Sequence, residues 1–188
     1  MKKYFTGICL TLSLLSSTAV AEETCVAGAC FPNEMQIGDG SYPLRGAALF
    51  EWYLFDVYSA AFYAPEGVDT IEEALGDVPK YLVLHYHGDI KRQNIIDNSE
   101  HILKENPAND MAALRDRLDR MYTAYSDVGE GDRFAMRYEP GKGTTLLFNG
   151  TPKAVLEGVD FQQAYFGIWL SRFSVGSKFT QRLLGTRS

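Results

Sequence analysis

Arg45 is the residue whose type and surroundings most directly suggest binding chemistry. It precedes an aromatic segment, Leu49–Tyr63 (LFEWYLFDVYSAAFY), in which Glu51 and Asp56 are the acidic residues. A guanidinium group can hold a ligand carboxylate through two parallel hydrogen bonds. A charge in apolar surroundings also needs a partner, so Arg45 could instead form an ion pair with Glu51 or Asp56. The residues around Arg45 leave both interpretations open.

A histidine pair suggests metal chemistry. His85, His87 and Asp89 are spaced so that a continuous strand would place all three on one face. However, Gly88 interrupts such a strand, Asp89 is better suited to capping the helix that follows, and no further ligand is evident. The sequence also lacks the motifs of serine hydrolases, zinc proteases and dinucleotide-binding proteins. We therefore expect no metal and no cofactor, and we assign no catalytic residue.

Residues 1–21 predict a secretory signal peptide. They contain Lys2 and Lys3, an apolar run from Ile8 to Leu15, and Ala19-Val20-Ala21 before the expected cleavage site. We therefore expect export, with the periplasm as the location. The net charge of −6 and the lack of a basic cluster argue against nucleic acid and anionic membranes as partners. No segment is long enough to predict stable insertion into a membrane.

Two cysteines follow the signal peptide, Cys25 and Cys30 in the sequence CVAGAC. An even pair in an exported chain predicts a structural disulfide. A redox or metal pair is less well supported, because the spacing is not C-x-x-C and two sulfurs make a poor metal site. We expect residues 22–41 to be a mobile lead-in held only by this disulfide, and residues 42–188 to form a single domain.

The elements that must position these residues follow from periodicity and turn signals. The aromatic segment is apolar at both sets of alternating positions, which predicts an extended segment that is covered on both faces or that covers a cavity on one. The later patterns predict a helix over 70–75, a strand over 81–87, a helix over 90–105 capped by Asp89, a helix over 111–125 capped by Asn109 or Asp110, strands over 134–138, 144–148 and 153–156, a helix over 161–170 capped by Asp160, and a last helix from Ser177. This order predicts an α+β fold, an open-faced antiparallel β-sheet with a helical layer on one face.

Several short motifs follow one another along the chain in a characteristic order. They are Leu44-Arg45-Gly46, Phe55–Tyr63, Pro79–Leu82, Gly131–Phe134, Tyr138 with Pro140-Gly141 and Gly143-Thr144, Asn149-Gly150, Phe161 with Phe166 and Ile168–Leu170, and Leu183-Leu184-Gly185. In this order the chain resembles the chalcone isomerase-like family, in its exported bacterial branch. The motifs span nearly all of the chain after the signal peptide.

The resemblance implies a ligand cleft between sheet and helices, with either fatty-acid binding or flavonoid isomerisation as the function. In the binding members an Arg and a Tyr hold the fatty-acid carboxylate, and the matching positions are Arg45 and Tyr58. The isomerases need a Thr where this chain has Tyr58, and a Tyr and an Asn in the following helix, where this chain offers only Asn94 and Asn98. The resemblance therefore favours binding. Arg45 and Tyr58 can converge only through a bend, bulge or hairpin, expected at Gly46–Ala48.

Our interpretation is a non-catalytic binder of a fatty acid or similar amphipathic carboxylate. Besides Arg45 and Tyr58, the expected apolar wall of the cleft is Trp52, Phe55, Phe62, Phe166 and Trp169, each of which could equally belong to the core. One alternative is an isomerase for a phenolic substrate, with Arg45 stabilising an oxyanion. Another is a structural or protein-interaction module in which Arg45 is paired internally. The sequence identifies no protein partner.

Overall fold

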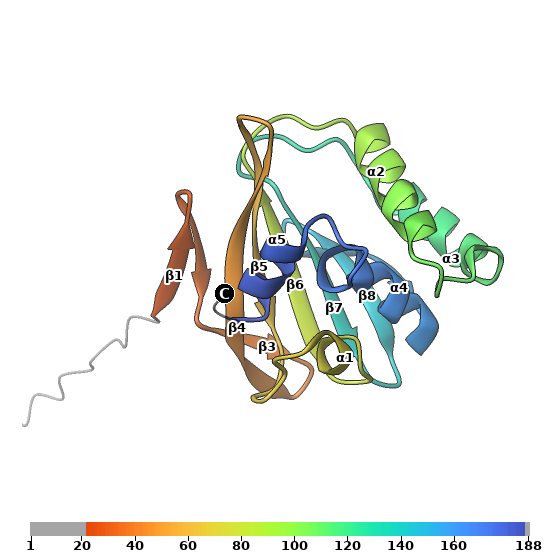
Figure 1. The fold of residues 1–188 in the computed structure, drawn as a ribbon, viewed down its shortest axis with the longest axis horizontal. Coiled ribbons are helices and arrows are strands. Elements are labelled where there is room, and N and C mark those ends of the chain that lie inside the picture. Colours follow the sequence, from red (N-terminus) through yellow and green to blue (C-terminus); the bar gives the residue numbers. More distant parts are fainter. Residues whose placement is uncertain (1–21, 187–188) are drawn as a thin grey trace, which may run out of the picture.

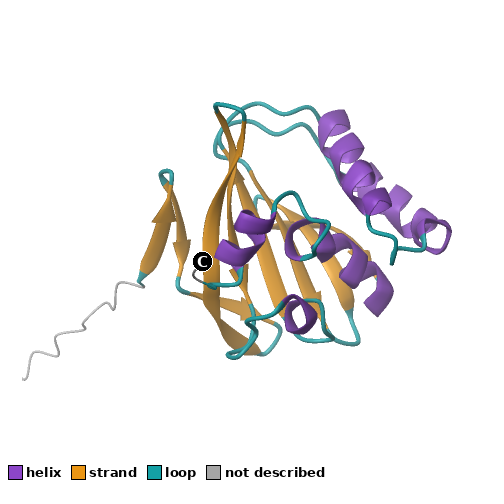
Figure 2. Cartoon of the chain, viewed as in Figure 1, coloured by secondary structure: helices purple, strands orange, loops and turns teal. Residues whose placement is uncertain are grey.

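A seven-stranded antiparallel sheet, with its strands in sequence order, forms the centre of the protein (Figures 1 and 2). The computed structural model describes residues 22–186, so the expected signal peptide lies outside the described residues. The strands are β3 (Glu34–Ile37), β4 (Gly40–Trp52), β5 (Phe55–Tyr63), β6 (Lys80–Tyr86), β7 (Arg133–Glu139), β8 (Gly143–Phe148) and β9 (Thr151–Leu156). Each pairs with the next along the chain.

Helices cover one face of this sheet. They are α1 (Ile71–Ala74), α2 (Arg92–Glu105), α3 (Met111–Ala124), α4 (Val159–Leu170) and α5 (Ser177–Leu183). In Figure 1, α4 and α5 lie directly against the strands, while α2 and α3 lie further out beside α4. Helix α4 is apolar nearly all round because it is buried on nearly all sides, with Phe161, Tyr165 and Phe166 fully inaccessible. The predicted α+β fold is confirmed.

The opposite face is covered by a hairpin of β1 (Glu23–Val26) and β2 (Ala29–Pro32), joined by the predicted disulfide between Cys25 and Cys30. Phe31 is fully buried there against Ala61 and other apolar residues of the sheet. The hydroxyls of Ser59 and Tyr63 donate to backbone carbonyls of the hairpin, at 3.0 and 2.8 Å. The prediction of a mobile lead-in is therefore wrong: the segment is ordered by Phe31 and by these hydrogen bonds.

The aromatic segment is a hairpin and not one extended strand. Trp52 pairs with Phe55, and Tyr53 and Leu54 form the turn between β4 and β5. The expectation that both faces are covered is confirmed for residues 58–63, since Tyr58 and Phe62 of β5 lie in the main core and Ala61 and Tyr63 lie in the cluster on the β1–β2 hairpin side. It is wrong for Trp52–Phe55, which are exposed at the turn. No turn residue in the sequence indicated this reversal.

Three helix caps illustrate local prediction. Asp110 caps α3 by accepting hydrogen bonds from the backbone N–H groups of residues 112 and 113, as predicted. Asp89 does not cap α2, whose first backbone N–H, that of Arg92, donates to the distant Asp127 at 2.8 Å. Asp160 lies within the first turn of α4, after the N-cap Gly158, and pairs with Arg117. The prediction that Asp89 and Asp160 cap these two helices is therefore wrong.

Among residues 22–186, no helix has the length and apolar character of a membrane span.

Candidate functional site

An apolar cleft lies between the strands β4–β6 and the helices α2 and α4. It has a volume of about 370 Å³, at the small end of the range typical of small-molecule sites. The sheet and α4 contribute most of its apolar lining residues, and α2 contributes most of its polar ones. The lining residues are Phe50, Trp52, Val57, Tyr58, Leu84, Tyr86, Ile90, Asn94, Ile95, Asn98, Ser99, Ile168, Trp169 and Val175.

Tyr58 and Trp169 form the wall of the cleft between β5 and α4. The indole Nε1–H of Trp169 donates to the hydroxyl of Tyr58 at 3.1 Å, and both side chains are nearly buried. Phe50 pairs with Tyr58 across β4 and β5, and their rings stack with centroids 5.0 Å apart. Phe179 of α5 packs edge-on against both rings, at 5.8 and 6.0 Å. The aromatic rings therefore fix the orientation of the Tyr58 hydroxyl.

Tyr58 and Tyr86 supply neutral hydrogen-bond donors to the cleft. The two strands are paired so that the two tyrosines are direct neighbours, with ring centroids 5.8 Å apart. Burial raises the pKa of both phenols, and for Tyr58 the bond from Trp169 opposes this only in part. No hydrogen bond from another described residue acts on the pKa of Tyr86. Since Tyr58 accepts from Trp169, its own O–H is available to donate. The O–H of Tyr86 is available to donate as well.

Helix α2 presents a polar and apolar stripe to the cleft. Asn94 and Asn98 lie one turn apart, as do Ile95 and Ser99, so the helical period places all four on the same side. The helix is anchored at its start, where the guanidinium of Arg92 donates to the carbonyl of Tyr122 at 3.1 and 2.5 Å. Asn94 and Asn98, which match the isomerase helix only in part, lie at the cleft although the sequence did not assign them to the binding site.

The cleft adjoins a second hollow of about 360 Å³. The two share Phe50, Trp52, Asn98 and Val175, and the second is further lined by residues that include His101, Glu105 and Phe173. A ligand longer than the cleft could therefore extend past Trp52 toward the end of α2.

Arg45 does not line this cleft. Its guanidinium pairs with Asp69, just before α1, and its side chain is only 18% exposed. It lies where β4 is bulged, between Leu44, which pairs with Tyr63, and Gly46, which pairs with Phe62. Tyr58 instead pairs with Phe50, five strand positions or about 17 Å further along β4. The predicted bulge and a hairpin both exist, yet they do not bring Arg45 and Tyr58 together. The internal ion pair of Arg45 exists, but with Asp69 and not with Glu51 or Asp56.

The remaining predicted wall residues divide between cleft, core and surface. Trp52 and Trp169 line the cleft with Tyr58. Phe62 and Phe166 are fully buried core residues and do not line it, because Phe62 points to the main core of the sheet and Phe166 lies on the inner side of α4. Phe55 is 75% exposed at the start of β5, beyond the cleft. Phe50 and Tyr86 are the lining aromatics that the sequence did not identify.

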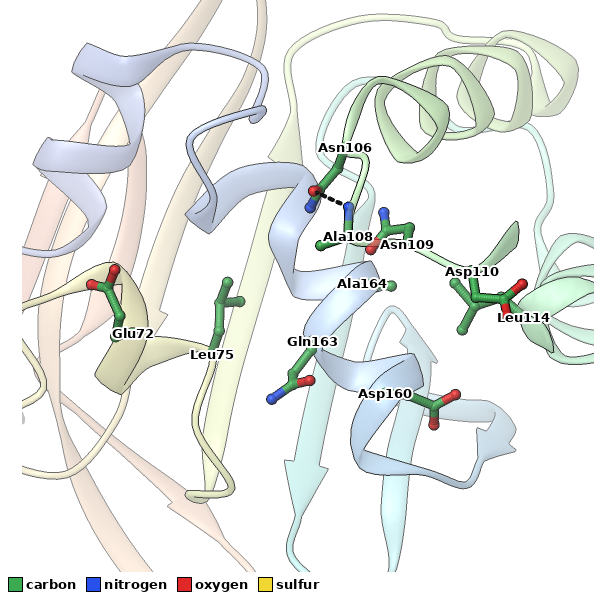
Figure 3. Close-up of a pocket in the computed structure, with 10 residues that line it drawn as sticks. All are labelled: Glu72, Leu75, Asn106, Ala108, Asn109, Asp110, Leu114, Asp160, Gln163 and Ala164. Atoms are coloured by element: carbon green, nitrogen blue, oxygen red, sulfur yellow. Dashed lines mark hydrogen bonds between the residues drawn. The ribbon is translucent and has the colours of Figure 1, made fainter. Parts of the chain in front are cut away.

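A larger hollow of about 430 Å³ lies between α1, the α2–α3 connection and α4, and its residues are shown in Figure 3. Most of its polar side chains already serve the fold. Asp110 caps α3, Asp160 pairs with Arg117, and the side chain of Asn109 donates to the carbonyl of Leu103 at 2.9 Å. Figure 3 also shows the Asn106 side chain accepting from the backbone of Ala108, at 3.1 Å. This hollow therefore offers fewer free polar groups to a ligand than the cleft does.

The histidine pair lies on the other face, below the β1–β2 hairpin. His87 is 2.8 Å from the hydroxyl of Ser59, and His85 accepts from the guanidinium of Arg133 at 3.1 Å. Burial, followed by the charge of Arg133, lowers the pKa of His85. No group of three or more His, Cys, Asp or Glu side chains suited to a metal occurs within residues 22–186. Ser59 and Arg133, the partners of the two histidines, in turn donate to the hairpin carbonyls of Val26 and Cys30.

Comparison with known proteins agrees with this geometry. A family model described as chalcone isomerase-like matches residues 23–185. The fold is similar to the crystal structure of a fatty-acid binding protein from Arabidopsis thaliana, with a TM-score of 0.65 and 15% sequence identity, over 87% of this chain and 96% of that one. No match was found among curated protein sequences.

Proposed function

We propose that this chain, which belongs to the chalcone isomerase-like family, is a non-catalytic binder of a single-chain amphipathic molecule such as a fatty acid or its neutral derivative. The observation that carries the proposal is the apolar cleft whose lining includes two neighbouring tyrosines, Tyr58 and Tyr86. Apolar walls with a few placed polar groups are typical of small-molecule sites. The similarity to a plant fatty-acid binding protein supports the same class of ligand.

The charge of the lining suggests which polar end the ligand carries. The residues that line the cleft in the described part of the chain are all uncharged, and Arg45 is not among them. A carboxylate placed there would lose its hydration without gaining a cationic partner. Phenol hydroxyls can still donate hydrogen bonds to a carbonyl oxygen. The cleft should therefore favour an amide, an ester or a protonated acid over an ionised carboxylate.

The location that we propose is an oxidising compartment outside the cytoplasm. The disulfide between Cys25 and Cys30 supports this, because disulfides persist in such compartments and are rare in the cytosol. The signal peptide predicted from residues 1–21 also supports export.

The proposal predicts how affinity depends on the ligand and on Tyr86. We expect dodecanamide to bind with an affinity that is constant between pH 5 and pH 8, and dodecanoate to bind more tightly as the pH falls, because the protonated acid is the form that the cleft accepts. Tyr86→Phe removes one donor without opening a cavity and should weaken dodecanamide binding about 2- to 10-fold. Isothermal titration calorimetry measures both effects.

Two variants serve as controls for this titration. Tyr63→Phe removes a phenol hydroxyl from the opposite face of the sheet, and Arg45→Ala removes the cation that pairs with Asp69. Both should leave the affinity for dodecanamide within about twofold of the parent. If Arg45→Ala abolishes dodecanoate binding at pH 8 and Tyr86→Phe has no effect, the ligand lies elsewhere and the proposed site is wrong.

A further inference from the structure

The tip of the β4–β5 hairpin is an exposed apolar surface. Four consecutive residues form it: Trp52, Tyr53, Leu54 and Phe55 are 62%, 85%, 93% and 75% exposed. The tip lies at the upper end of the sheet in Figure 1, away from the β1–β2 hairpin and from α1. Single exposed apolar residues are ordinary, but a contiguous group of four large ones marks an interaction surface.

The turn at this tip is built from unfavourable residues. Tyr53 has a backbone φ of 56°, in the left-handed region, whereas Leu54 does not have a positive φ. Tight hairpins with positive φ at the first turn position prefer glycine there, and a bulky residue in this conformation is strained. A Tyr-Leu turn therefore gives up stability that Gly-Asn would provide. Strain of this kind is found where a side chain is required at the position.

The tip is also part of the cleft entrance. Trp52 lines both the cleft and the neighbouring hollow while remaining 62% exposed, so the apolar surface continues from the tip into the cleft. A molecule entering from the tip side would pass from one apolar surface to another. The proposed ligand, an amphipathic single-chain lipid, resides mainly in membranes because burial of its CH₂ groups is favourable.

Charge next to the tip selects the kind of surface. Glu51 and Asp56 pair directly opposite each other immediately behind Trp52 and Phe55, and the whole chain has a net charge of −6. These charges disfavour an anionic surface, whereas exposed Trp and Tyr suit the boundary between headgroups and acyl chains. The narrow, convex shape of a two-residue turn fits between lipid headgroups.

We infer that the tip, Trp52–Phe55, docks shallowly on a zwitterionic lipid bilayer and places the cleft entrance at the membrane surface for exchange of the ligand. This inference rests on the proposed function, since it assigns the source from which the ligand enters. The occupant of the tip is the bilayer surface, and docking there needs no membrane-spanning segment.

Flotation with phosphatidylcholine vesicles tests the inference. We expect the protein to float with the vesicles, and vesicles that carry bromine atoms near the headgroup end of the acyl chains should quench Trp52 fluorescence. The variant Tyr53→Gly/Leu54→Asn supplies the residues that the turn prefers and removes the two most exposed side chains. It should fold at least as stably, keep the parent affinity for dodecanamide, and bind the vesicles roughly tenfold more weakly or worse.

A second variant protects the test against a folding defect. Leu54→Asp changes one fully solvated side chain and adds a charge, so it should also lose vesicle binding while its melting temperature stays near that of the parent. The inference is overturned if the parent does not float with phosphatidylcholine, if it floats only with phosphatidylglycerol vesicles, or if both variants float like the parent. If the parent protein binds vesicles but does not bind dodecanamide, the proposed function is contradicted and the docking surface is still supported.

Discussion

Replacing Gly46 with alanine is expected to destabilise the protein by about 3 kcal/mol. A Cβ atom at this position would lie 2.0 Å from the backbone oxygen of Arg182 and 2.8 Å from that of Leu183. Backbone atoms at the end of α5 cannot rotate away as a side chain can, so the helix must shift from β4. Because Phe179 of α5 packs on the rings of Phe50 and Tyr58, affinity for dodecanamide should fall as well. Urea unfolding followed by circular dichroism measures the change in stability.

Gly88→Ala is the matched control for this substitution. A Cβ atom there meets no atom within 4 Å, and its backbone does not lie in the left-handed region. We expect a change within about 0.5 kcal/mol. If Gly46→Ala is as stable as Gly88→Ala, then α5 does not dock on β4 as closely as the structure has it.

The second large effect is a rise in stability with pH that depends on Lys80. Its side chain is fully buried, with Nζ 2.5 Å from the carbonyl of Gly76 and 2.8 Å from the side-chain oxygen of Gln162. Burial lowers the pKa of Lys80 to about 7, and the nearby charge of Asp77 opposes this shift. In the unfolded chain the pKa should return to about 10.4.

The sign of the effect follows from proton uptake. Above pH 7 folded Lys80 is neutral while unfolded Lys80 is charged, so unfolding binds a proton and the free energy of unfolding increases with pH. Between pH 7.5 and pH 9 the slope should approach about 1.4 kcal/mol per pH unit, and below pH 7 it should vanish. Above this range the buried tyrosines, whose pKa values are raised, act in the opposite direction, so the measurement should stop near pH 9.

Urea unfolding at a series of pH values measures this slope. Lys80→Met should remove it, and should lower stability by about 1–3 kcal/mol near pH 8, because the oxygens of Gly76 and Gln162 lose their donor. Lys142→Met changes an exposed lysine that pairs with Glu139, and should preserve the slope. A parent protein whose stability is flat from pH 7 to pH 9 would show that Lys80 stays charged in the folded state.

The second half of the fold was predictable because local signals agree there with tertiary structure. Strands β7–β9 alternate or carry apolar runs, and Asn149-Gly150 provides the turn residues with positive φ that a tight hairpin needs. Asp110 lies where a cap is needed and is used as one. In these stretches propensity, periodicity and turn chemistry indicate the same elements.

Prediction from the sequence failed where residues that are distant in the sequence determine the local structure. The Tyr53-Leu54 turn has no turn signature, so the aromatic segment resembled one strand. The N-terminus of α2 is satisfied by Asp127, 35 residues away from Arg92, and not by the nearby Asp89. Phe31 is the one aromatic residue among residues 23–32, and its burial depends on a sheet face that later strands form.

Only part of the candidate site could be predicted, because some of its contacts also depend on residues that are distant in the sequence. Tyr58 and Trp169 line the cleft, and their neighbourhood could be expected from the family motifs. The partner of Arg45 could not, because Asp69 lies 24 residues away and is brought near by the path of the chain into α1. Phe50, which takes the place opposite Tyr58, became identifiable only once the register of the hairpin was known.

Occupation of the cleft by an amphipathic ligand is tested most directly through the tryptophan side chains. The chain contains two tryptophans, Trp52 and Trp169, and both line the cleft. In a ¹H–¹⁵N spectrum of the protein titrated with dodecanamide, both indole N–H signals should shift and saturate together, and Ile95→Trp, which fills the cleft, should abolish the shift of Trp169. If neither indole signal moves while dodecanamide binds, or if the Trp169 shift persists unchanged in Ile95→Trp, the ligand does not enter this cleft.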